Sequence, residues 1–303
     1  MMDIVIPTLN EEFYLPELLK SLEKQTYKDF KVYVSDGGSK DKTVEAAKKF
    51  QDTLTLTVVS DNKKGVSHQR NMGARAGNSS IILFIDADVV LHPNFLLTIT
   101  KQINGHNLAN CWARTQSTNP VDQFLFLMYN LLALEIGKYI WPAGLGSSIY
   151  TTRKNFEDVG GFDESLVIWE DVDFIKRSLK AGANFIILRQ PRIFLSTRRF
   201  EVEGRINILL EVAKGMQYSL RTGKMPTEKH ISYPMGLNYT ELLQQKRVSE
   251  KRLSKFLRQY TKYLRLMKEL HISSIRRHVR IPTIREISVF LRNGNPNSPK
   301  TKQ

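Results

Sequence analysis

The sequence predicts an α/β protein, in which a largely parallel sheet is flanked by helices and followed by a basic helical appendage. Three observations support this prediction. Short apolar runs alternate with amphipathic helical stretches, which is typical of βαβ units with right-handed crossovers. The chain has 303 residues, 41% of them hydrophobic, which suits one large domain plus an appendage. Positive charge is concentrated at the carboxyl end, where residues 241–303 carry +12 of the net +15.

A main domain is predicted over residues 1–200, and its first half, 1–90, alternates regularly. The hydrophobic pattern predicts strands over residues 3–8, 31–35, 54–60 and 80–85. It predicts helices over residues 11–24 and 66–76, and a further helix between them that begins after residue 39 or 41 and ends at residue 50. Asn10 is the expected N-cap of the first helix, and Ser39 or Asp41 that of the second. The fourth strand is the most apolar and is therefore expected at the centre of the sheet.

The second half of the main domain, residues 91–200, is less regular. Helices are predicted over residues 93–103, 121–140, 153–159 and 168–181. Strands are predicted over residues 108–117, 144–151, 183–188 and 193–197. The region 201–303 is expected to be basic and helical, above all over 241–271, with about the last 12 residues disordered because they are rich in Asn, Pro, Ser and Lys.

Polar motifs follow the first two predicted strands. Pro7, Thr8, Asn10 and Glu11 stand at the end of the first, where ligands bind in open α/β sheets. The chain has no glycine before Gly37, so the G-x-G-x-x-G loop of dinucleotide-binding dehydrogenases is absent. An ordinary turn with an Asn cap is the alternative interpretation of this motif.

The residues after the second and third strands suit a nucleotide. The Asp36 carboxylate can accept a hydrogen bond from a base imide or a ribose hydroxyl, and Gly38 lets the backbone approach closely. Arg70, on the helix after the third strand, could reach a diphosphate. The alternatives are a capped glycine turn and a surface helix.

Paired carboxylates follow the fourth strand. Asp86 and Asp88 straddle Ala87, and two like charges that close repel unless a cation lies between them. Residues two apart on a strand share a face, so both side chains are expected to point into one cleft. Carboxylate oxygens suit Mg²⁺ or Mn²⁺, with substrate phosphates completing the shell. The alternative is a capped turn before Pro93.

A second acidic group opens the helix predicted over 168–181. Glu170 and Asp171 lie at its start, where the helix dipole favours anions. The functional interpretation is a carboxylate base directed into the cleft, and the alternative is helix-end electrostatics alone.

Together these motifs resemble the family-2 glycosyltransferases of the GT-A fold. The resemblance covers about residues 3–199 and rests on P-T-L-N-E at 7–11, D-G-G-S-K-D at 36–41, R-N-M-G at 70–73, D-A-D at 86–88, G-G-F-D-E at 160–164 and E-D-V-D at 170–173. It implies a Rossmann-like mixed sheet with a nucleotide-binding half, 1–90, and an acceptor half, 91–200. It also implies an inverting, metal-dependent hexosyltransferase that uses a UDP- or GDP-sugar and an acceptor hydroxyl on a lipid-linked or glycan molecule.

The resemblance assigns roles to individual residues. It implies that Asp36 contacts the base, that Asp86 and Asp88 hold the nucleotide and Mn²⁺ or Mg²⁺, and that Asp171 is the catalytic base. The expected nucleotide-sugar site consists of Pro7, Thr8, Asn10, Glu11, Asp36, Gly38, Arg70, Asp86, Arg198 and Arg199. The expected acceptor side consists of Trp141, Gly144, Trp169 and Glu170.

The basic tail suggests a membrane surface. Leu253, Phe256, Leu257, Tyr260, Leu264, Met267 and Leu270 share one helical face between basic residues, the pattern of an interfacial helix. The alternative is a helix docked on the main domain. The start of the chain lacks the features of a signal peptide, and the lone Cys111 fits a reducing compartment. We therefore expect a cytoplasmic protein, located peripherally at the inner face of the membrane.

Two other function classes remain open at this stage. A nucleotidyltransferase also uses paired aspartates and a metal, but it would usually show a glycine-rich and basic phosphate loop after the first strand, which this sequence lacks. A nucleic-acid-binding protein could use the basic tail, but it would need aromatic platforms beside the charges. The tail helix carries two tyrosines, and Phe256 belongs to its apolar stripe, so no nucleic-acid partner is expected.

Overall fold

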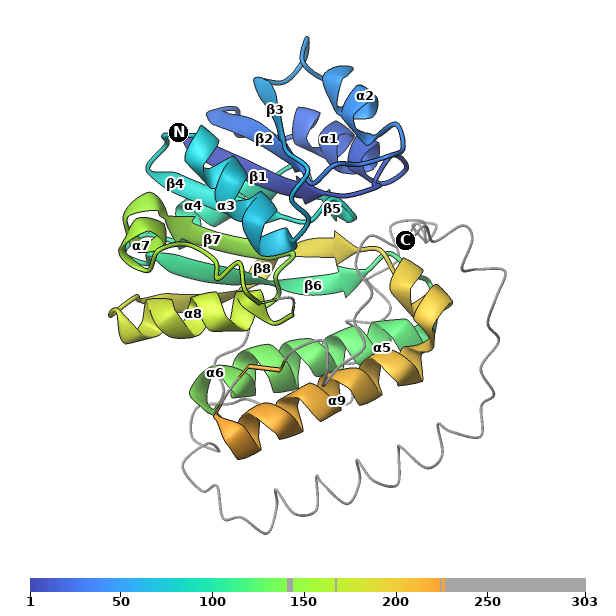
Figure 1. Ribbon diagram of the computed structural model, residues 1–303, viewed down its shortest axis with the longest axis vertical. Helices are drawn as coiled ribbons and strands as arrows, with labels where there is room; N and C mark the ends of the chain where they lie inside the picture. Colours follow the sequence, from blue (N-terminus) through green and yellow to red (C-terminus); the bar gives the residue numbers. More distant parts are fainter. Residues whose placement is uncertain (141–143, 167, 224, 227–303) are drawn as a thin grey trace, which may run out of the picture.

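A computed structural model describes residues 1–140, 144–166, 168–223 and 225–226 of the chain (Figure 1). Its centre is an eight-stranded sheet in the order β3-β2-β1-β4-β7-β6-β8-β5. The strands are β1 (Met2–Thr8), β2 (Phe30–Asp36), β3 (Leu56–Ser60), β4 (Ile81–Ile85), β5 (Val89–Leu91), β6 (Leu108–Thr115), β7 (Ser148–Thr152) and β8 (Phe185–Leu195).

The sheet is mixed. Strands β1 to β4 run parallel to one another, as the alternating pattern predicted, and β4 lies between β1 and β7 near the centre. Strand β7 then runs antiparallel to both β4 and β6. Beyond it, β6 and β8 are parallel, and the short β5 is antiparallel to β8. This matches the mixed sheet that the family resemblance implied.

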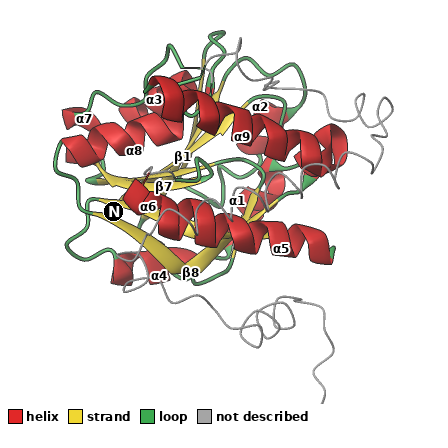
Figure 2. Cartoon of the chain, turned by 90° about the horizontal axis from the view of Figure 1, so that it is seen from below, coloured by secondary structure: helices red, strands yellow, loops and turns green. Residues whose placement is uncertain are grey.

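Helices cover both faces of the sheet. They are α1 (Leu15–Glu23), α2 (Thr43–Lys48), α3 (Val66–Ala76), α4 (Phe95–Gln102), α5 (Pro120–Tyr129), α6 (Gly137–Ile140), α7 (Arg153–Asp158), α8 (Glu170–Lys180) and α9 (Arg205–Thr222), with π-helices η1 (Asn130–Ile136) and η2 (Phe200–Gly204). The larger core cluster packs α1, α2 and α4 on one face, and a second cluster packs α3, α7 and α8 on the other. Figure 2 shows α3, α7 and α8 on the side of the sheet opposite α4.

Several predicted boundaries were wrong, and the cause is tertiary contact. Helix α1 begins at Leu15 with Tyr14 as its N-cap, because Asn10 takes a left-handed conformation (φ 58°) and its side chain accepts a hydrogen bond from the Lys40 backbone instead. Ser39 and Asp41 do not hold the N-cap of α2 either, which is Lys42, although Asp41 accepts a hydrogen bond from the Thr43 backbone.

Three differences concern whole elements in the second half. The two strands predicted over 183–188 and 193–197 form one strand, β8, with a shifted register opposite β6. The long helix predicted over 121–140 is divided by the π-helix η1. The three-residue strand β5 was not predicted, because it is too short to show a period.

The described part of the basic region contains α9, and at its start the Arg205 guanidinium pairs with Asp122 of α5 (2.5 Å, Nε to Oδ1). The predicted interfacial helix over 241–271 and the predicted disorder of the last residues lie outside the described residues. Among the helices that the structure describes, none combines the length and the apolar character needed to cross a membrane.

Candidate active site

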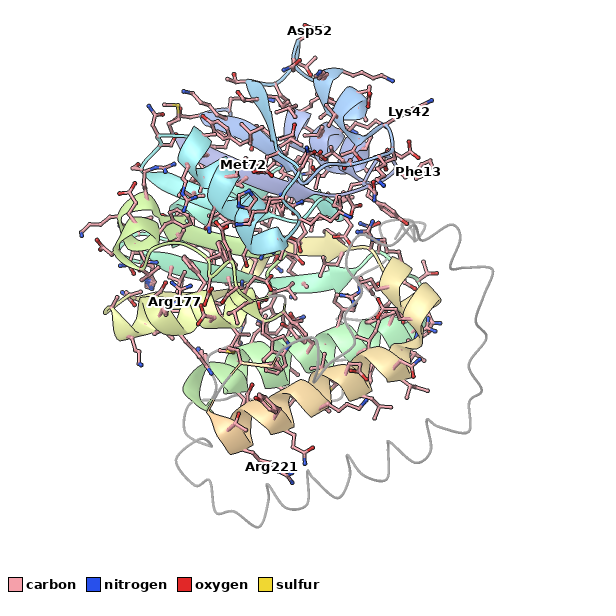
Figure 3. The ribbon with its side chains drawn as sticks, viewed as in Figure 1. Phe13, Lys42, Asp52, Met72, Arg177 and Arg221 are labelled. Atoms are coloured by element: carbon pink, nitrogen blue, oxygen red, sulfur yellow. The ribbon has the colours of Figure 1, made fainter. Side chains whose placement is uncertain are left out.

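The predicted site lies where β1, β2 and β4 end. Thr8 and Asp36 are paired at the ends of β1 and β2, so the two loops that follow leave the sheet side by side. Figure 3 shows Phe13 and Lys42, from these two loops, at the same edge of the molecule. Asp86 and Asp88 lie in the turn between β4 and β5, not on the strand itself, and this turn opens at the same edge.

Asp36 organises the loop that follows it. Its Oδ2 accepts hydrogen bonds from the backbone N–H groups of Gly38 (3.0 Å) and Ser39 (2.9 Å), and its Oδ1 accepts one from the Thr8 hydroxyl (3.3 Å). Gly38 has a φ of 81°, a conformation that favours glycine. The buried carboxylate therefore fixes a left-handed turn at the edge of the site.

A second set of bonds ties the loop after β1 to the loop after β2. The Asn10 N–H donates to the Ser39 hydroxyl (2.8 Å), and the Glu11 N–H donates to Thr43 Oγ1 (2.7 Å). Pro7 lies within β1, paired with Ser35, and is buried. The sequence motif at 7–11 is thus a rigid connection between two strands as well as a wall of the site.

Arg198 connects the segment that follows β8 to the loop that follows β1. Its guanidinium makes a two-point ion pair with Glu11, with Nη1–Oε2 at 2.5 Å and Nη2–Oε1 at 2.6 Å. Its Nε lies 3.3 Å from Asp88 Oδ2, and its Cζ lies 4.3 Å from the centre of the Tyr14 ring. Burial raises the pKa of Glu11 to about 7 despite the neighbouring guanidinium, and burial also raises the pKa of Asp88.

Arg70 is a deeply buried charge of the site, with 2% of its surface exposed. Its Nη1 donates to Glu170 Oε1 (2.7 Å), and its Nη2 donates to Asp86 Oδ1 (3.0 Å) and to the Gly146 carbonyl (3.1 Å). Its Cζ lies 5.2 Å from the centre of the Phe162 ring. One guanidinium therefore connects α3, the β4–β5 turn, the loop before β7 and the start of α8.

Asp171 lies in the first turn of α8, next to this guanidinium. Burial and the charge of Glu170 raise its pKa, and the charge of Arg70 opposes them. Gly146 lies against it: a Cβ at this position would be 3.1 Å from Asp171 Oδ2 and 2.9 Å from Arg70 Nη2. Trp169, just before the helix, takes a left-handed conformation (φ 62°), which turns the chain into α8.

The remaining predicted residues are distributed as follows. Arg199 pairs with Glu203 of η2 (Nε–Oε1 2.9 Å), and its charge favours ionised Asp88. The Gly144 carbonyl accepts a hydrogen bond from the Tyr129 hydroxyl (3.4 Å). Trp141 lies outside the described residues. The structure thus brings Glu11, Asp86, Asp88 and Asp171 together with Arg70 and Arg198 at one edge.

Two neighbours of Asp171 were not singled out from the sequence, although the family resemblance places their segments, 124–141 and 142–146, on the acceptor side. Tyr129 belongs to an apolar stretch that gave no polar signal, and burial, together with the charge of Asp171, raises the pKa of its hydroxyl. Gly146 stands in the Gly-Leu-Gly segment at 144–146, where two closely spaced glycines could have indicated a close approach of backbone and side chains.

The chemistry of the acidic residues fits a hard divalent cation. Asp86 and Asp88 offer carboxylate oxygens that Arg70 and Arg198 neutralise in this structure, with side chains 31% and 15% exposed. The part of the chain that the structure describes contains no group of three or more metal-ligating side chains. Mg²⁺ and Mn²⁺ need no such group when a substrate phosphate supplies further oxygens. The two aspartates therefore fit a metal that is held jointly with a phosphate.

Comparisons with known proteins agree with this geometry. The model of a family described as "Glycosyl transferase family 2" matches residues 3–159. The chain is 37% identical to the "PGL/p-HBAD biosynthesis glycosyltransferase" of Mycobacterium bovis, over 64% of this chain and 92% of that protein. It is 26% identical to "Glycosyltransferase AglE" of Haloferax volcanii over 59% of this chain, and it spans about three fifths (61%) of that relative.

Two solved structures share the fold. Staphylococcus aureus TarS 1–349 in complex with UDP-GlcNAc is 24% identical with a TM-score of 0.55, over 65% of this chain and 58% of that one. The mannosyltransferase PcManGT from Pyrobaculum calidifontis, in complex with GDP-Man and Mn²⁺, is 22% identical with a TM-score of 0.57, over 74% of this chain and 65% of that one. The mixed sheet with its flanking helices is therefore the GT-A fold that the resemblance implied.

Proposed function

Because the chain belongs to glycosyl transferase family 2, we propose that it transfers a hexose from a nucleoside-diphosphate donor to a hydroxyl group of an acceptor. The observation that carries this proposal is the Arg70 guanidinium, which holds Asp86 of the donor side and Glu170, the neighbour of Asp171, in one cluster. Arg70 thus connects the turn proposed to bind the donor with the helix that carries the candidate base, Asp171. This arrangement suits a reaction in which two substrates meet at this edge of the sheet.

The donor half is proposed from the edge formed by β1, β2 and β4. The loop fixed by Asp36 and Gly38 is suited to the base and ribose, and Arg198 and Arg199 supply positive charge near Asp88 for the diphosphate. The structures of two relatives contain UDP-GlcNAc and GDP-Man, which supports a UDP- or GDP-sugar here. Asp86 and Asp88 would hold Mg²⁺ or Mn²⁺, whose positive charge offsets that of the diphosphate.

Asp171 is the proposed base. In the transfer, the acceptor oxygen forms a bond to the anomeric carbon, the bond from that carbon to the diphosphate oxygen breaks, and the acceptor proton passes to the carboxylate. Its partly buried position beside Glu170 raises its pKa, which makes it a better proton acceptor near neutral pH. A base on the side opposite the leaving group gives inversion at the anomeric carbon.

The acceptor side is proposed to include Gly144, Glu170, Trp169 and Trp141, together with Tyr129, which lies close enough to Asp171 to feel its charge. The division into a catalytic domain over 1–200 and a basic region over 201–303 is part of the same proposal. So is a peripheral location at the cytoplasmic face of an anionic membrane.

A panel of nucleotide-sugars tests the function. The full chain is incubated with each donor and Mn²⁺ or Mg²⁺, without acceptor, and the release of free sugar and nucleoside diphosphate is followed. We expect slow hydrolysis of one UDP- or GDP-sugar, and less of it with Asp171→Asn. Release of sugar 1-phosphate and nucleoside monophosphate instead would indicate a nucleotidyltransferase, and no turnover of any donor would contradict the proposal.

A further inference from the structure

His68 of helix α3 lies between two carboxylates that come from different loops. Its Nε2 is 2.6 Å from Asp61 Oδ2, in the loop between β3 and α3, and its Nδ1 is 2.9 Å from Glu164 Oε2, in the segment between α7 and α8. A neutral imidazole has one N–H and one lone pair, so it can donate to only one of these carboxylates. The imidazolium can donate to both and is therefore the form that fits this geometry. We call the three side chains the His68 clamp.

Glu164 is the fixed end of the clamp, because its segment is held to α3 independently of His68. Asn71, also on α3, donates from its Nδ2 to Glu164 Oε1 (3.0 Å) and to the Phe162 carbonyl (2.8 Å). The Asn71 Oδ1 accepts a hydrogen bond from the Phe162 N–H (2.9 Å). Asn71 is almost completely buried, so water does not compete for these bonds. The carboxylate of Glu164 is thus an anchor on which His68 can pull.

Asp61 is the end of the clamp that shapes its own loop. Its Oδ1 accepts a hydrogen bond from the Lys63 N–H (2.9 Å), and its own N–H donates to the Asp36 carbonyl (3.3 Å). The loop lies against the turn that follows β2, since a Cβ added at Gly38 would be 3.5 Å from Asn62 Oδ1 and 3.6 Å from the Asp61 carbonyl oxygen. The position of the Asp61 carboxylate therefore decides where one wall of the turn proposed for the base lies.

The charged groups that the structure describes around the ring are Asp61, Glu164, Lys63 and Arg75. Lys63 and Arg75 lie 2.5 Å and 3.9 Å from Glu164, but their side chains are 58% and 65% exposed, whereas that of His68 is 15% exposed. Burial lowers the pKa of His68, but the hydrogen bonds and charges of the two carboxylates outweigh it and raise the pKa above the ordinary value of 6.5. The contribution of the clamp is therefore complete below about pH 6.5 and is lost as the pH rises through the raised pKa.

We propose that His68 is a positioning residue for the donor: its imidazolium, held between Asp61 and Glu164, keeps the loop after β3 beside the turn that receives the base. The inference rests on the proposed function, which assigns that turn to the donor. Arg70, two positions further along α3, connects the β4–β5 turn with the start of α8. Loss of the proton from His68 leaves that connection and Asp171 in place. The expected effect is weaker donor binding.

Calorimetry of the full chain with UDP and with GDP, in Mg²⁺ at about pH 6 and about pH 9, tests the inference. His68→Gln removes the charge and can donate from one nitrogen only. We expect this variant to bind the nucleotide about fivefold more weakly than the wild type at the lower pH, the loss expected for one hydrogen bond. At the higher pH the wild type has lost its proton, and the two affinities should be equal. Other titrating groups are common to both proteins, so their effects cancel at each pH.

His68→Arg is the rescue variant. It keeps the positive charge, presents several N–H groups and stays protonated at both pH values. It should bind the nucleotide as the wild type does at the lower pH and about fivefold more tightly than the wild type at the higher pH. The matched control is His92→Gln, which removes an exposed histidine between β5 and α4. The control should match the wild type at both pH values.

Three results would overturn the proposal. The first is equal affinity of the wild type and His68→Gln at the lower pH. The second is a loss of the same size at both pH values, because a purely structural role of the side chain does not depend on its proton. The third is a His68→Arg variant that binds as weakly as His68→Gln at the lower pH, since charge would then not be what holds the loop.

The titration of His68, followed by NMR of its ring protons without nucleotide, separates the clamp from the proposed function. The pKa of His68 should be lower in Asp61→Asn and in Glu164→Gln than in the wild type, because each change removes one of the two charges that raise it. An unchanged pKa in either variant refutes the clamp. If neither UDP nor GDP binds any of the proteins while the pKa falls in both variants, the proposed function fails and the clamp stands.

Discussion

Arg70 and Glu170, 100 positions apart in the chain, form a buried ion pair with 2.7 Å between Nη1 and Oε1. The same guanidinium donates to Asp86 at 3.0 Å. Helix α3, which carries Arg70, thus sets the distance between the turn proposed to hold the donor and the helix proposed to hold the base.

Replacing Arg70 with alanine should destabilise the fold. The change removes the positive partner of the Asp86 and Glu170 carboxylates, of which Glu170 is the more buried. Breaking a buried ion pair lowers the free energy of unfolding by about 3–5 kcal/mol. Urea unfolding measures the loss. Arg75→Ala, on the exposed side of the same helix, should change the free energy of unfolding by less than about 0.5 kcal/mol. A similar small change for both variants would show that the buried pair contributes little.

Asp171→Asn should bind the donor normally but lower turnover by about 10² or more, because the amide cannot take the acceptor proton. Donor affinity is measured by calorimetry and turnover by nucleoside diphosphate release. Asp173→Asn is the control, since Arg177 holds that carboxylate at 2.7 Å. If the effects were exchanged between the two variants, Asp173 would be the base.

The rate should rise with pH and level off above about pH 7. Burial and the charge of Glu170 raise the pKa of Asp171 to about 7, and the base works in its ionised form, so activity is lost as the pH falls through that value. The dependence of kcat/KM on pH, with a saturating acceptor, reports this group. A rate that stays constant down to about pH 5 would exclude a base with a raised pKa.

Asp88→Ala should abolish metal-dependent donor binding while the fold survives. Arg198 keeps its two-point pair with Glu11 after the change, so the wall of the site has no unpaired guanidinium. Donor affinity is compared with and without Mn²⁺. Asp52→Ala removes a carboxylate from an exposed loop far from the site and should have no effect (Figure 3). Normal Mn²⁺-dependent turnover in Asp88→Ala would remove this residue from the metal site.

The full chain should sediment with anionic vesicles in low salt and less in high salt. The reason is the +12 charge of residues 241–303 and the apolar stripe within them. The Debye length falls from about 10 Å at 0.1 M salt to about 3 Å at 1 M, so the attraction should weaken. Neutral vesicles are the control. Absence of the chain from the anionic pellet would favour a tail that packs on the main domain.

The sequence allowed elements with strong local patterns to be predicted well. Helix α3 was predicted over 66–76, and its bounds are Val66–Ala76, because its sequence alone satisfies the helical period. Asn10 was assigned the wrong role because its partners, Ser39 and Lys40, are about 30 positions away. The direction of β7 could not be predicted either, because side chains alternate in the same way in parallel and antiparallel strands.

In the candidate site, too, local patterns could be predicted and long-range contacts could not. Asp86 and Asp88 follow a strand and Asp171 lies at the start of a helix, so their positions along the chain were enough to propose them. Arg70 was predicted to reach a diphosphate, but the structure places its side chain against Glu170 and Asp86, contacts that depend on the packing of α3 against α8 and the β4–β5 turn. Tyr129 likewise comes close to Asp171 through tertiary packing, which no local pattern in the sequence indicates.

Asn130 protects part of strand β6 from pairing with a strand of another molecule. Its buried side chain accepts a hydrogen bond from the Ala113 N–H (3.0 Å) and donates one to the Ala113 carbonyl (2.8 Å), on the stretch of β6 beyond β7. One amide group thereby takes the place of a neighbouring peptide. An exposed strand edge is a template on which a foreign strand can add and begin aggregation. The N–H and C=O groups of Ala113 are already bonded to Asn130. Strands β6 and β8 can therefore extend past the rest of the sheet without offering the backbone of Ala113 to a strand of another chain.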